Sequence, residues 1–211
     1  MKNPSLKISA LSLALISAPM SFSSFANDGP IAIAIHGGAG TISKAKMTDK
    51  RRAAYESKLE QAVKAGYKLL EQGKPSQQAV VAAIQVLEES PLFNAGKGAV
   101  YTFDEAHELD ASIMNGKTLN AGAVAGVKTV KSPIALAEKV MEKSVHVMLS
   151  GEGAEIFAKQ EQLEMVENNY FDTPNRYKSL LRAKKKLAEK EQELKDFQAA
   201  HKSLDAKFKF G

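Results

Sequence analysis

The spacing of apolar residues changes from a helical to a strand-like period along the chain, and this change constrains the fold most. Apolar residues recur every three to four positions in residues 50–72, which predicts a helix that ends at Gly73. Residues 111–114 and 121–127 are short apolar runs separated by a segment with Asn115-Gly116, which predicts two strands and a tight turn. Alternating helices and strands, with consecutive strands joined by tight turns, indicate an α+β fold whose sheet is covered by helices on its outer face.

The other predicted elements follow the same alternation. Pro75 and Ser76 open a second helix that Pro91 bounds, and Ser132-Pro133 starts a helix that runs to about residue 143. Strands are also predicted at residues 31–35, 100–103 and 145–149, and a helix at 153–160. No segment of about 20–50 residues recurs, so this is not a repeat protein.

The two ends of the chain differ in composition from the part between them. Thr173 is a predicted helix cap and Pro174 the first helical residue of a charged segment. In that segment Leu180, Leu187 and Leu194 form one thin apolar stripe, which fades after about residue 200. We therefore interpret residues 27–172 as an αβ unit, and residues 173–211 as a charged helix followed by an exposed, flexible arm.

The N-terminal segment has a charged, an apolar and a small-residue region in the order that is typical of a secretory signal peptide. Lys2 and Lys7 precede an apolar stretch at residues 8–16, and Ser24 and Ala26 then occupy the −3 and −1 positions of a plausible cleavage site. An N-terminal membrane anchor or a buried helix is the alternative, although the stretch is shorter than the about 20 residues that a membrane span needs. The prediction is a signal peptide at residues 1–26 and a periplasmic or extracellular mature protein.

Composition excludes several classes of site. The chain has no cysteine, so disulfide bonds, thiolate zinc sites and cysteine nucleophiles are impossible. The formal net charge is +5, but the basic run at residues 182–186 is followed by Glu189, Glu191 and Glu193, which is typical of a solvated helix face rather than a nucleic-acid patch.

The sequence motifs that bind nucleotides or metals, or supply a serine nucleophile, in other proteins are incomplete in this chain. The glycine-rich segments at residues 36–40, 94–98 and 151–153 lack the spacing of dinucleotide and P-loop motifs. The histidines have no metal-ligand spacing, and no serine lies in a nucleophile elbow. Glu108 and Asp110 share a face if residue 109 lies in a strand, either as paired catalytic acids or as a structural polar cluster. These motifs alone indicate only an αβ secreted domain.

Four blocks of sequence, in order, give the chain a family resemblance. They are HGGAG at residues 36–40, LFNAGKGAV at 92–100 with ELDASIMNG at 108–116, AGAVAGV at 121–127, and VHVML at 145–149 followed by GEGAE at 151–155. The chain thereby resembles the plant-type L-asparaginases and isoaspartyl peptidases from residue 31 to about 177. This resemblance implies an αββα sandwich of the N-terminal nucleophile hydrolase type.

The resemblance also implies how the protein matures. Family members cut themselves between a glycine and a threonine, the new N-terminal threonine becomes the nucleophile, and two αβ units assemble as (αβ)2. This chain resembles the α half, which places Gly211 at the left side of the cut and the nucleophile on a β partner. A glycine tolerates the strained backbone that such a cut requires.

The resemblance further implies supporting sites within this chain. It assigns a structural sodium ion, with no catalytic cofactor, to main-chain carbonyls of six residues: Leu87, Glu88, Ser90, Phe93, Ala95 and Lys97. Carbonyl ligation suits a hard cation and depends little on side chains. Asn94 matches an asparagine beside the nucleophile in relatives, where it would help to hold the threonine or the substrate.

Substrates and alternatives follow from the same comparison of residues. The implied substrates are small molecules, either asparagine or isoaspartyl dipeptides, with selection expected from the partner; no nucleic-acid or membrane partner is implied. Val145 stands where relatives often have proline, and no Thr-Val-Gly-Ala-Val segment follows Gly211. A truncated, inactive fragment and a periplasmic small-ligand binding module therefore remain as alternatives.

Overall fold

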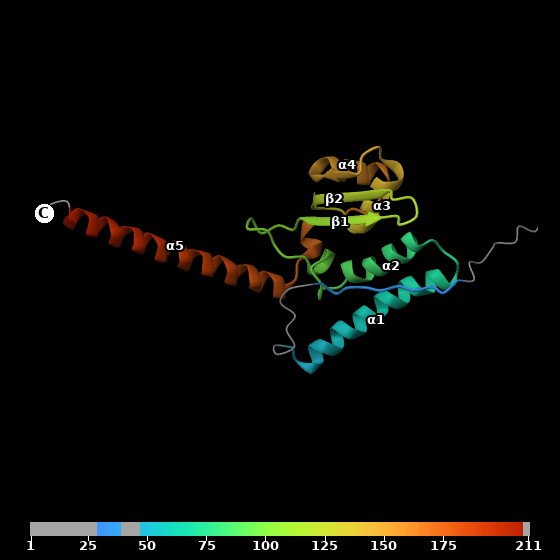
Figure 1. Ribbon diagram of the computed structural model, residues 1–211, viewed down its shortest axis with the longest axis horizontal. Helices are drawn as coiled ribbons and strands as arrows, with labels where there is room; N and C mark the ends of the chain where they lie inside the picture. Colours follow the sequence, from blue (N-terminus) through green and yellow to red (C-terminus); the bar gives the residue numbers. More distant parts are fainter. Residues whose placement is uncertain (1–28, 39–46, 209–211) are drawn as a thin grey trace, which may run out of the picture.

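The computed structural model describes residues 29–38 and 47–208, which form a small sheet, packed helices and one projecting helix (Figure 1). In chain order the elements are α1 (Asp49–Glu71), α2 (Ser76–Glu88), the 3₁₀ turn η2 (Gly96–Gly98), β1 (Leu109–Met114), β2 (Ala121–Val127), α3 (Pro133–Lys143), β3 (Met148–Ser150), α4 (Gly151–Gln160), the 3₁₀ turn η3 (Asn168–Phe171) and α5 (Pro174–Phe208). The predicted signal peptide and Gly211 lie outside the described residues.

The sheet has the strand order β1-β2-β3 and combines both kinds of pairing. β1 pairs antiparallel with β2, as the turn at Asn115-Gly116 predicts, whereas β3 adds parallel to β2 after the α3 crossover. The α+β prediction is therefore confirmed. β3 overlaps the predicted strand at 145–149 only at Met148 and Leu149, and it extends to Ser150. Val145 precedes the paired residues and is 96% exposed.

Side chains alternate between the two faces of the sheet. Leu109 and Ile113 of β1 and Val124 of β2 are buried on the face that α3 covers, within the main apolar core. On the other face Ser112 and Met114 of β1 are exposed, next to the alanines of β2 that pair with them. One face of the sheet is therefore packed, and the other is open.

Gly122 of β2 allows α3 to approach the sheet closely. A Cβ at this position would overlap the carbonyl oxygen of Ala137 and lie 2.5 Å from the main-chain nitrogen of Met141. The face of α3 that meets the sheet is apolar, since Ile134, Leu136, Ala137 and Val140 are all at most 1% exposed. Only glycine fits here because the helix backbone itself forms the contact.

The predicted strand at residues 31–35 is wrong, because no strand pairing is present there among the described residues. The segment runs along α1 and α2 instead (Figure 1), and the side chain of Ile33 lies against Gly66 of α1. Its β-branched residues have strand character, but strand structure also needs a neighbouring strand, and the described sheet is elsewhere.

The predicted strand at residues 100–103 is also wrong. Residues 102–106 form a tight turn in which the Thr102 nitrogen donates to the Ala106 carbonyl at 2.7 Å, and Glu105 adopts a positive φ of 65°. The turn that the sequence predicts at Asp104-Glu105 is present. Val100 and Phe103 are exposed at the surface rather than paired in the sheet.

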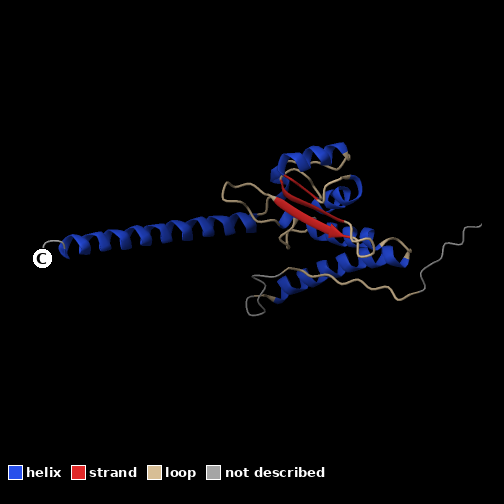
Figure 2. Ribbon diagram, turned by 45° about the horizontal axis from the view of Figure 1, so that its top comes forward, coloured by secondary structure: helices blue, strands red, loops and turns tan. Residues whose placement is uncertain are grey.

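The C-terminal helix α5 begins where the sequence predicts and ends later. The Thr173 hydroxyl caps it by accepting from the Arg176 nitrogen at 3.3 Å, and the helix continues to Phe208 without the break expected near residue 200. Only its first turns contact the body, since Leu180 is buried whereas Leu187 and Leu194 are exposed. Figures 1 and 2 both show the rest of α5 projecting away from the body.

We expect Gly122→Ala to destabilise the fold by more than about 2 kcal/mol, because the added methyl group must displace backbone of α3. Gly116→Ala is the matched control, since nothing lies within 4 Å of its Cβ position, and it should change stability by less than about 0.5 kcal/mol. Urea unfolding followed by circular dichroism measures both. Equal stabilities of the two variants would contradict this account of the contact.

Candidate functional site

The segment between α2 and β1 contains the residues that the sequence analysis assigns to a cation loop. α2 ends at Glu88, and the chain then curls back through η2. Gly96 allows this reversal because its φ is +48°, a conformation that side chains disfavour. Hydrogen bonds from the Ser90 nitrogen to the Leu87 carbonyl (3.1 Å) and from the Gly98 nitrogen to the Ala95 carbonyl (3.0 Å) close the two ends of the curl.

Three of the six assigned carbonyl oxygens face the Gly96–Gly98 turn. A Cβ on Gly96 would overlap the Glu88 carbonyl oxygen, and one on Gly98 would overlap that of Phe93 and lie 3.0 Å from that of Ser90. The Ala95 carbonyl accepts one hydrogen bond and keeps a second lone pair, whereas the Leu87 carbonyl accepts from the nitrogens of both Glu89 and Ser90. The loop therefore brings several main-chain oxygens together around glycines that have no side chains to separate them.

The loop is anchored to the body on two sides. The Tyr55 hydroxyl of α1 donates to the Leu92 carbonyl at 2.9 Å, and the Phe93 ring, 5% exposed, packs edge-on against the Tyr55 ring. On the other side, Arg176 of α5 donates from Nε to the Gly98 carbonyl. These contacts fix the outer turn of the loop, so that its inner oxygens keep their positions.

Asn94 lies on the exposed rim of this loop. Its side-chain oxygen accepts a hydrogen bond from the Val100 nitrogen at 2.9 Å, while Val100 itself is half exposed. The side chain thus fixes the exit of the loop. Its amide nitrogen has no described hydrogen-bond partner, and it therefore offers a donor at the surface.

The side chain of Glu88 is a feature that the sequence analysis missed. The residue is only 6% exposed, and its carboxylate accepts from the Ser132 hydroxyl at 2.6 Å and from the Ile134 nitrogen at 2.9 Å. Burial raises the pKa of this carboxyl to about 7, against the lowering effect of the two hydrogen bonds. No local motif marks Glu88, because its partners lie more than forty residues away in sequence.

A surface network surrounds the entrance to this loop. The Tyr170 hydroxyl donates to Glu89 at 2.8 Å, and the ammonium groups of Lys97 and Lys131 lie 3.5 and 3.6 Å from the same carboxylate. Partial burial raises the pKa of Glu89, but the hydrogen bond from Tyr170 and the two lysines outweigh it and hold the pKa below its ordinary value. These exposed ion pairs orient side chains and contribute little to stability.

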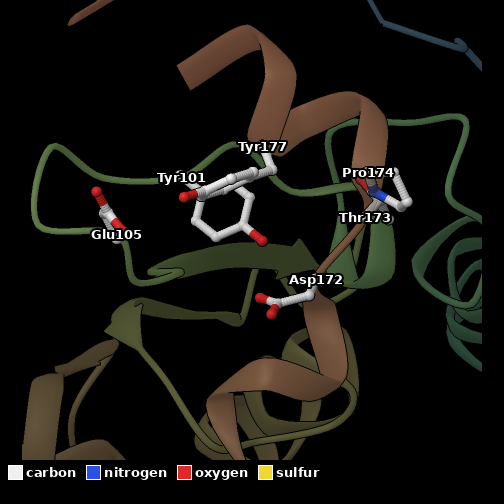
Figure 3. Close-up of a pocket in the computed structure, with 6 residues that line it drawn as sticks. All are labelled: Tyr101, Glu105, Asp172, Thr173, Pro174 and Tyr177. Atoms are coloured by element: carbon white, nitrogen blue, oxygen red, sulfur yellow. The ribbon is translucent and has the colours of Figure 1, made fainter. Parts of the chain in front are cut away.

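A hollow of about 410 Å³ lies at the base of α5 (Figure 3). It is lined by Tyr101, Glu105, Asp172, Thr173, Pro174 and Tyr177. The Tyr101 hydroxyl and the Asp172 carboxylate point toward each other, and burial together with Asp172 raises the pKa of Tyr101 to about 12. This phenol stays protonated at neutral pH, so it is a donor rather than a base.

His107 lies fully buried behind that hollow. Its ring nitrogens lie 3.2 Å from the Val100 carbonyl and 3.1 Å from Asp172, and Tyr101 and Phe171 pack on the ring. His107 is therefore a packed histidine whose two ring nitrogens both have a hydrogen-bonding partner. Within residues 29–38 and 47–208, no group of three or more His, Cys, Asp and Glu residues has metal-binding geometry.

Glu108 and Asp110 have separate structural partners. Glu108 pairs with Lys128 at 3.1 Å, while the Asp110 carboxylate accepts from the Gly126 nitrogen at 2.8 Å. Gly126 has a φ of +64°, and here the pairing register of β1 with β2 shifts. The two carboxylates therefore support the ends of the strands, as the structural alternative predicts.

None of the helices in the described part of the chain is both long and apolar enough to cross a membrane.

We expect the protein to become less stable as the pH rises and Glu88 loses its proton. Because its pKa in the folded state, about 7, exceeds the ordinary 4.5, the folded chain binds more protons than the unfolded chain between these values. The free energy of unfolding should therefore fall by on the order of 3 kcal/mol across this range, and Glu88→Gln should remove this drop. Urea unfolding of the wild type and of Glu88→Gln at several pH values measures this drop. If the free energy of unfolding changes with pH in the same way in both proteins, the raised pKa of Glu88 is contradicted.

Comparison with known proteins identifies the family. The family described as asparaginase matches residues 29–211. The isoaspartyl peptidase of Escherichia coli K12 is 51% identical over 160 residues, which cover 76% of this chain and 50% of the relative. The plant-type L-asparaginase of Pyrococcus abyssi is 53% identical over 129 residues, which cover 61% of this chain and 41% of the relative.

The aligned part is therefore limited to about half of the curated relatives, although it covers most of this chain. An isoaspartyl peptidase/L-asparaginase of Xenopus laevis is similar in the same way, with 42% identity over 136 residues, 64% of this chain and 42% of the relative. The family match over residues 29–211 and the identity of about 50% to these relatives lead to one conclusion: this chain belongs to the asparaginase family that contains the isoaspartyl peptidases and plant-type L-asparaginases.

Proposed function

We propose that this chain is the α subunit of a secreted isoaspartyl peptidase/L-asparaginase that acts with a β partner beginning in threonine. The observation that carries the proposal is the 51% identity to an isoaspartyl peptidase of which the chain spans half. The proposed reaction is hydrolysis of the asparagine side-chain amide or of a β-aspartyl peptide bond. Its substrates are small molecules.

The proposed chemistry uses two groups of one partner residue. The threonine hydroxyl attacks the amide carbon and its own α-amine accepts the hydroxyl proton. The resulting α-ammonium gives this proton to the leaving nitrogen as the C–N bond breaks, which releases ammonia or an amine. Water then hydrolyses the resulting ester. An α-amine suits this role because its ordinary pKa of about 8 lies near neutrality, and it becomes free only after the chain is cut beyond Gly211.

The contribution of this chain is support for that site. Asn94 is proposed to hold the nucleophile or the substrate, and its surface position with a side-chain amide donor is compatible with that role. The carbonyls of Leu87, Glu88, Ser90, Phe93, Ala95 and Lys97 are proposed to bind sodium. The inward-facing oxygens around Gly96 and Gly98 fit a hard cation, which would neutralise their mutual repulsion and keep the loop curled.

The partner is proposed to supply a second layer of sheet. The open face of β1 exposes Met114 (60%), and Met148 of β3, on the other side of β2 in the same sheet, is 55% exposed. The segment at residues 31–35 has strand composition but no strand partner among the described residues. Both features support an αββα sandwich completed by a β subunit, and an (αβ)2 assembly of the whole enzyme.

Activity should require the partner. We expect the chain alone to release no ammonia from asparagine and to leave β-Asp-Leu uncleaved, because the proposed nucleophile belongs to the β subunit. Co-expression with a partner that begins in threonine should give both activities, and a partner that begins in alanine is the matched control. Turnover by the isolated chain, or equal turnover with both partners, would refute the proposal.

Export should remove the first 26 residues. The charged, apolar and small-residue regions before Asn27 motivate this expectation. Intact-mass measurement of the protein recovered from the periplasm of a Gram-negative host should give an N-terminus at Asn27. Replacing Ser24 and Ala26 with larger residues should block the cleavage. A mature periplasmic species that retains Met1 would contradict the signal-peptide assignment.

A further inference from the structure

Glu88 connects two parts of the protein through two different chemical groups. Its main-chain carbonyl faces Gly96 inside the curled loop, and its side-chain carboxylate points the other way, to the start of α3. The residue lies at the last position of α2, so that any movement of the helix end also moves the loop entrance. A single buried residue is therefore shared by the loop and by α3.

The start of α3 depends on this carboxylate. Ser132 occupies the N-cap position but makes no capping hydrogen bond of its own, and Pro133 follows it. The backbone nitrogen of Ile134 lies in the first turn of α3 and has no hydrogen-bond partner within the helix. It is buried, and it donates to the Glu88 carboxylate at 2.9 Å. The partial positive charge at the N-terminus of α3 partly offsets the cost of burying this carboxylate.

The capped helix is itself fixed to the sheet. α3 contacts β2 at Gly122 without an intervening side chain, and its apolar face is fully buried. The carboxylate of Glu88 thus ties the end of α2 to the most tightly packed layer of the protein. Tyr55 and Arg176 hold the middle and exit of the loop, whereas Glu88 holds its entrance.

We propose that the side chain of Glu88 is a positioning group for the cation loop, which aligns the loop entrance by capping α3. The inference rests on the proposed cation site but assigns a separate role to a side chain that is not a ligand. Glutamine at this position retains the size of the side chain but loses one acceptor oxygen. Its NH₂ group would then face either the Ser132 hydroxyl or the Ile134 N–H, and the loop entrance would shift.

The test measures cation binding without enzymatic activity. The full chain is unfolded thermally in increasing sodium chloride, with choline chloride holding the ionic strength constant, and amide exchange is followed in residues 89–98. The wild type should show a sodium-dependent rise in melting temperature and slower exchange in the loop. Glu88→Gln should weaken the apparent sodium affinity at least tenfold, which corresponds to about 1.4 kcal/mol.

Two further variants separate positioning from general stability. Ser132→Ala removes the hydroxyl that donates to Glu88 and accepts from Gln85. It should weaken sodium affinity by about fivefold, so it tests the inference even if Glu88→Gln folds poorly. Glu164→Gln is the matched control, since Glu164 lines one surface groove together with Glu88 and Ser132 but is bonded to neither of them. Its carboxylate pairs with Lys131, which lies 3.6 Å from Glu89, so this variant also shows whether the surface ion pairs affect sodium binding. Its sodium response should equal that of the wild type.

The outcomes distinguish the alternatives. Loss of the sodium response in Glu88→Gln and its reduction in Ser132→Ala, with a normal response in Glu164→Gln, would support the inference. If the variants melt at lower temperature but bind sodium with unchanged affinity, Glu88 is only a structural cap and the inference is overturned. A wild type whose melting temperature does not depend on sodium would also overturn the inference. Failure of the amidase assay with a normal sodium response would refute only the proposed function.

Discussion

The close contact between α3 and β2 is the constraint on which the rest of the structure depends. Because Gly122 has no side chain, the helix backbone lies directly on the strand, and the apolar residues of α3 fill the core on both sides of this point. The strand that carries Gly122 also forms the centre of the sheet, with β1 and β3 as its neighbours. Both the sheet and the helices are therefore positioned relative to one contact.

Carboxylates from distant parts of the chain satisfy the backbone around that core. Glu88 accepts from the Ile134 nitrogen, Glu155 from the nitrogens of Lys128 and Thr129, and Asp110 from the Gly126 nitrogen. In the described residues no buried side-chain nitrogen or oxygen lacks a partner. Each of these bonds fixes the end of a strand or helix where backbone groups would otherwise be unpaired. The curled loop between α2 and β1 is attached to this framework through Glu88.

The sequence predictions succeeded where a structure depends on interactions between neighbouring residues, and they failed where it depends on residues far apart in the chain. Helix α1, the turn at Asn115-Gly116 and the Thr173 cap depend on neighbouring residues, and the structure confirms them. The predicted strands at 31–35 and 100–103 failed because composition does not provide a pairing partner. The curl of the loop was expected from resemblance and its glycines, whereas the side-chain role of Glu88 required knowledge of which helix start lies beside it.

The sequence by itself determined the elements that local forces form and the family to which the chain belongs. Periodic apolar residues, glycines at turns and capping residues act over a few positions, and the four ordered blocks are a property of the sequence alone. Tertiary structure alone decided which segments pair, which carboxylate caps which helix, and which face of the sheet remains open. Those choices depend on contacts between residues far apart in the chain, where burial and hydrogen bonding act only after the fold has brought the groups together.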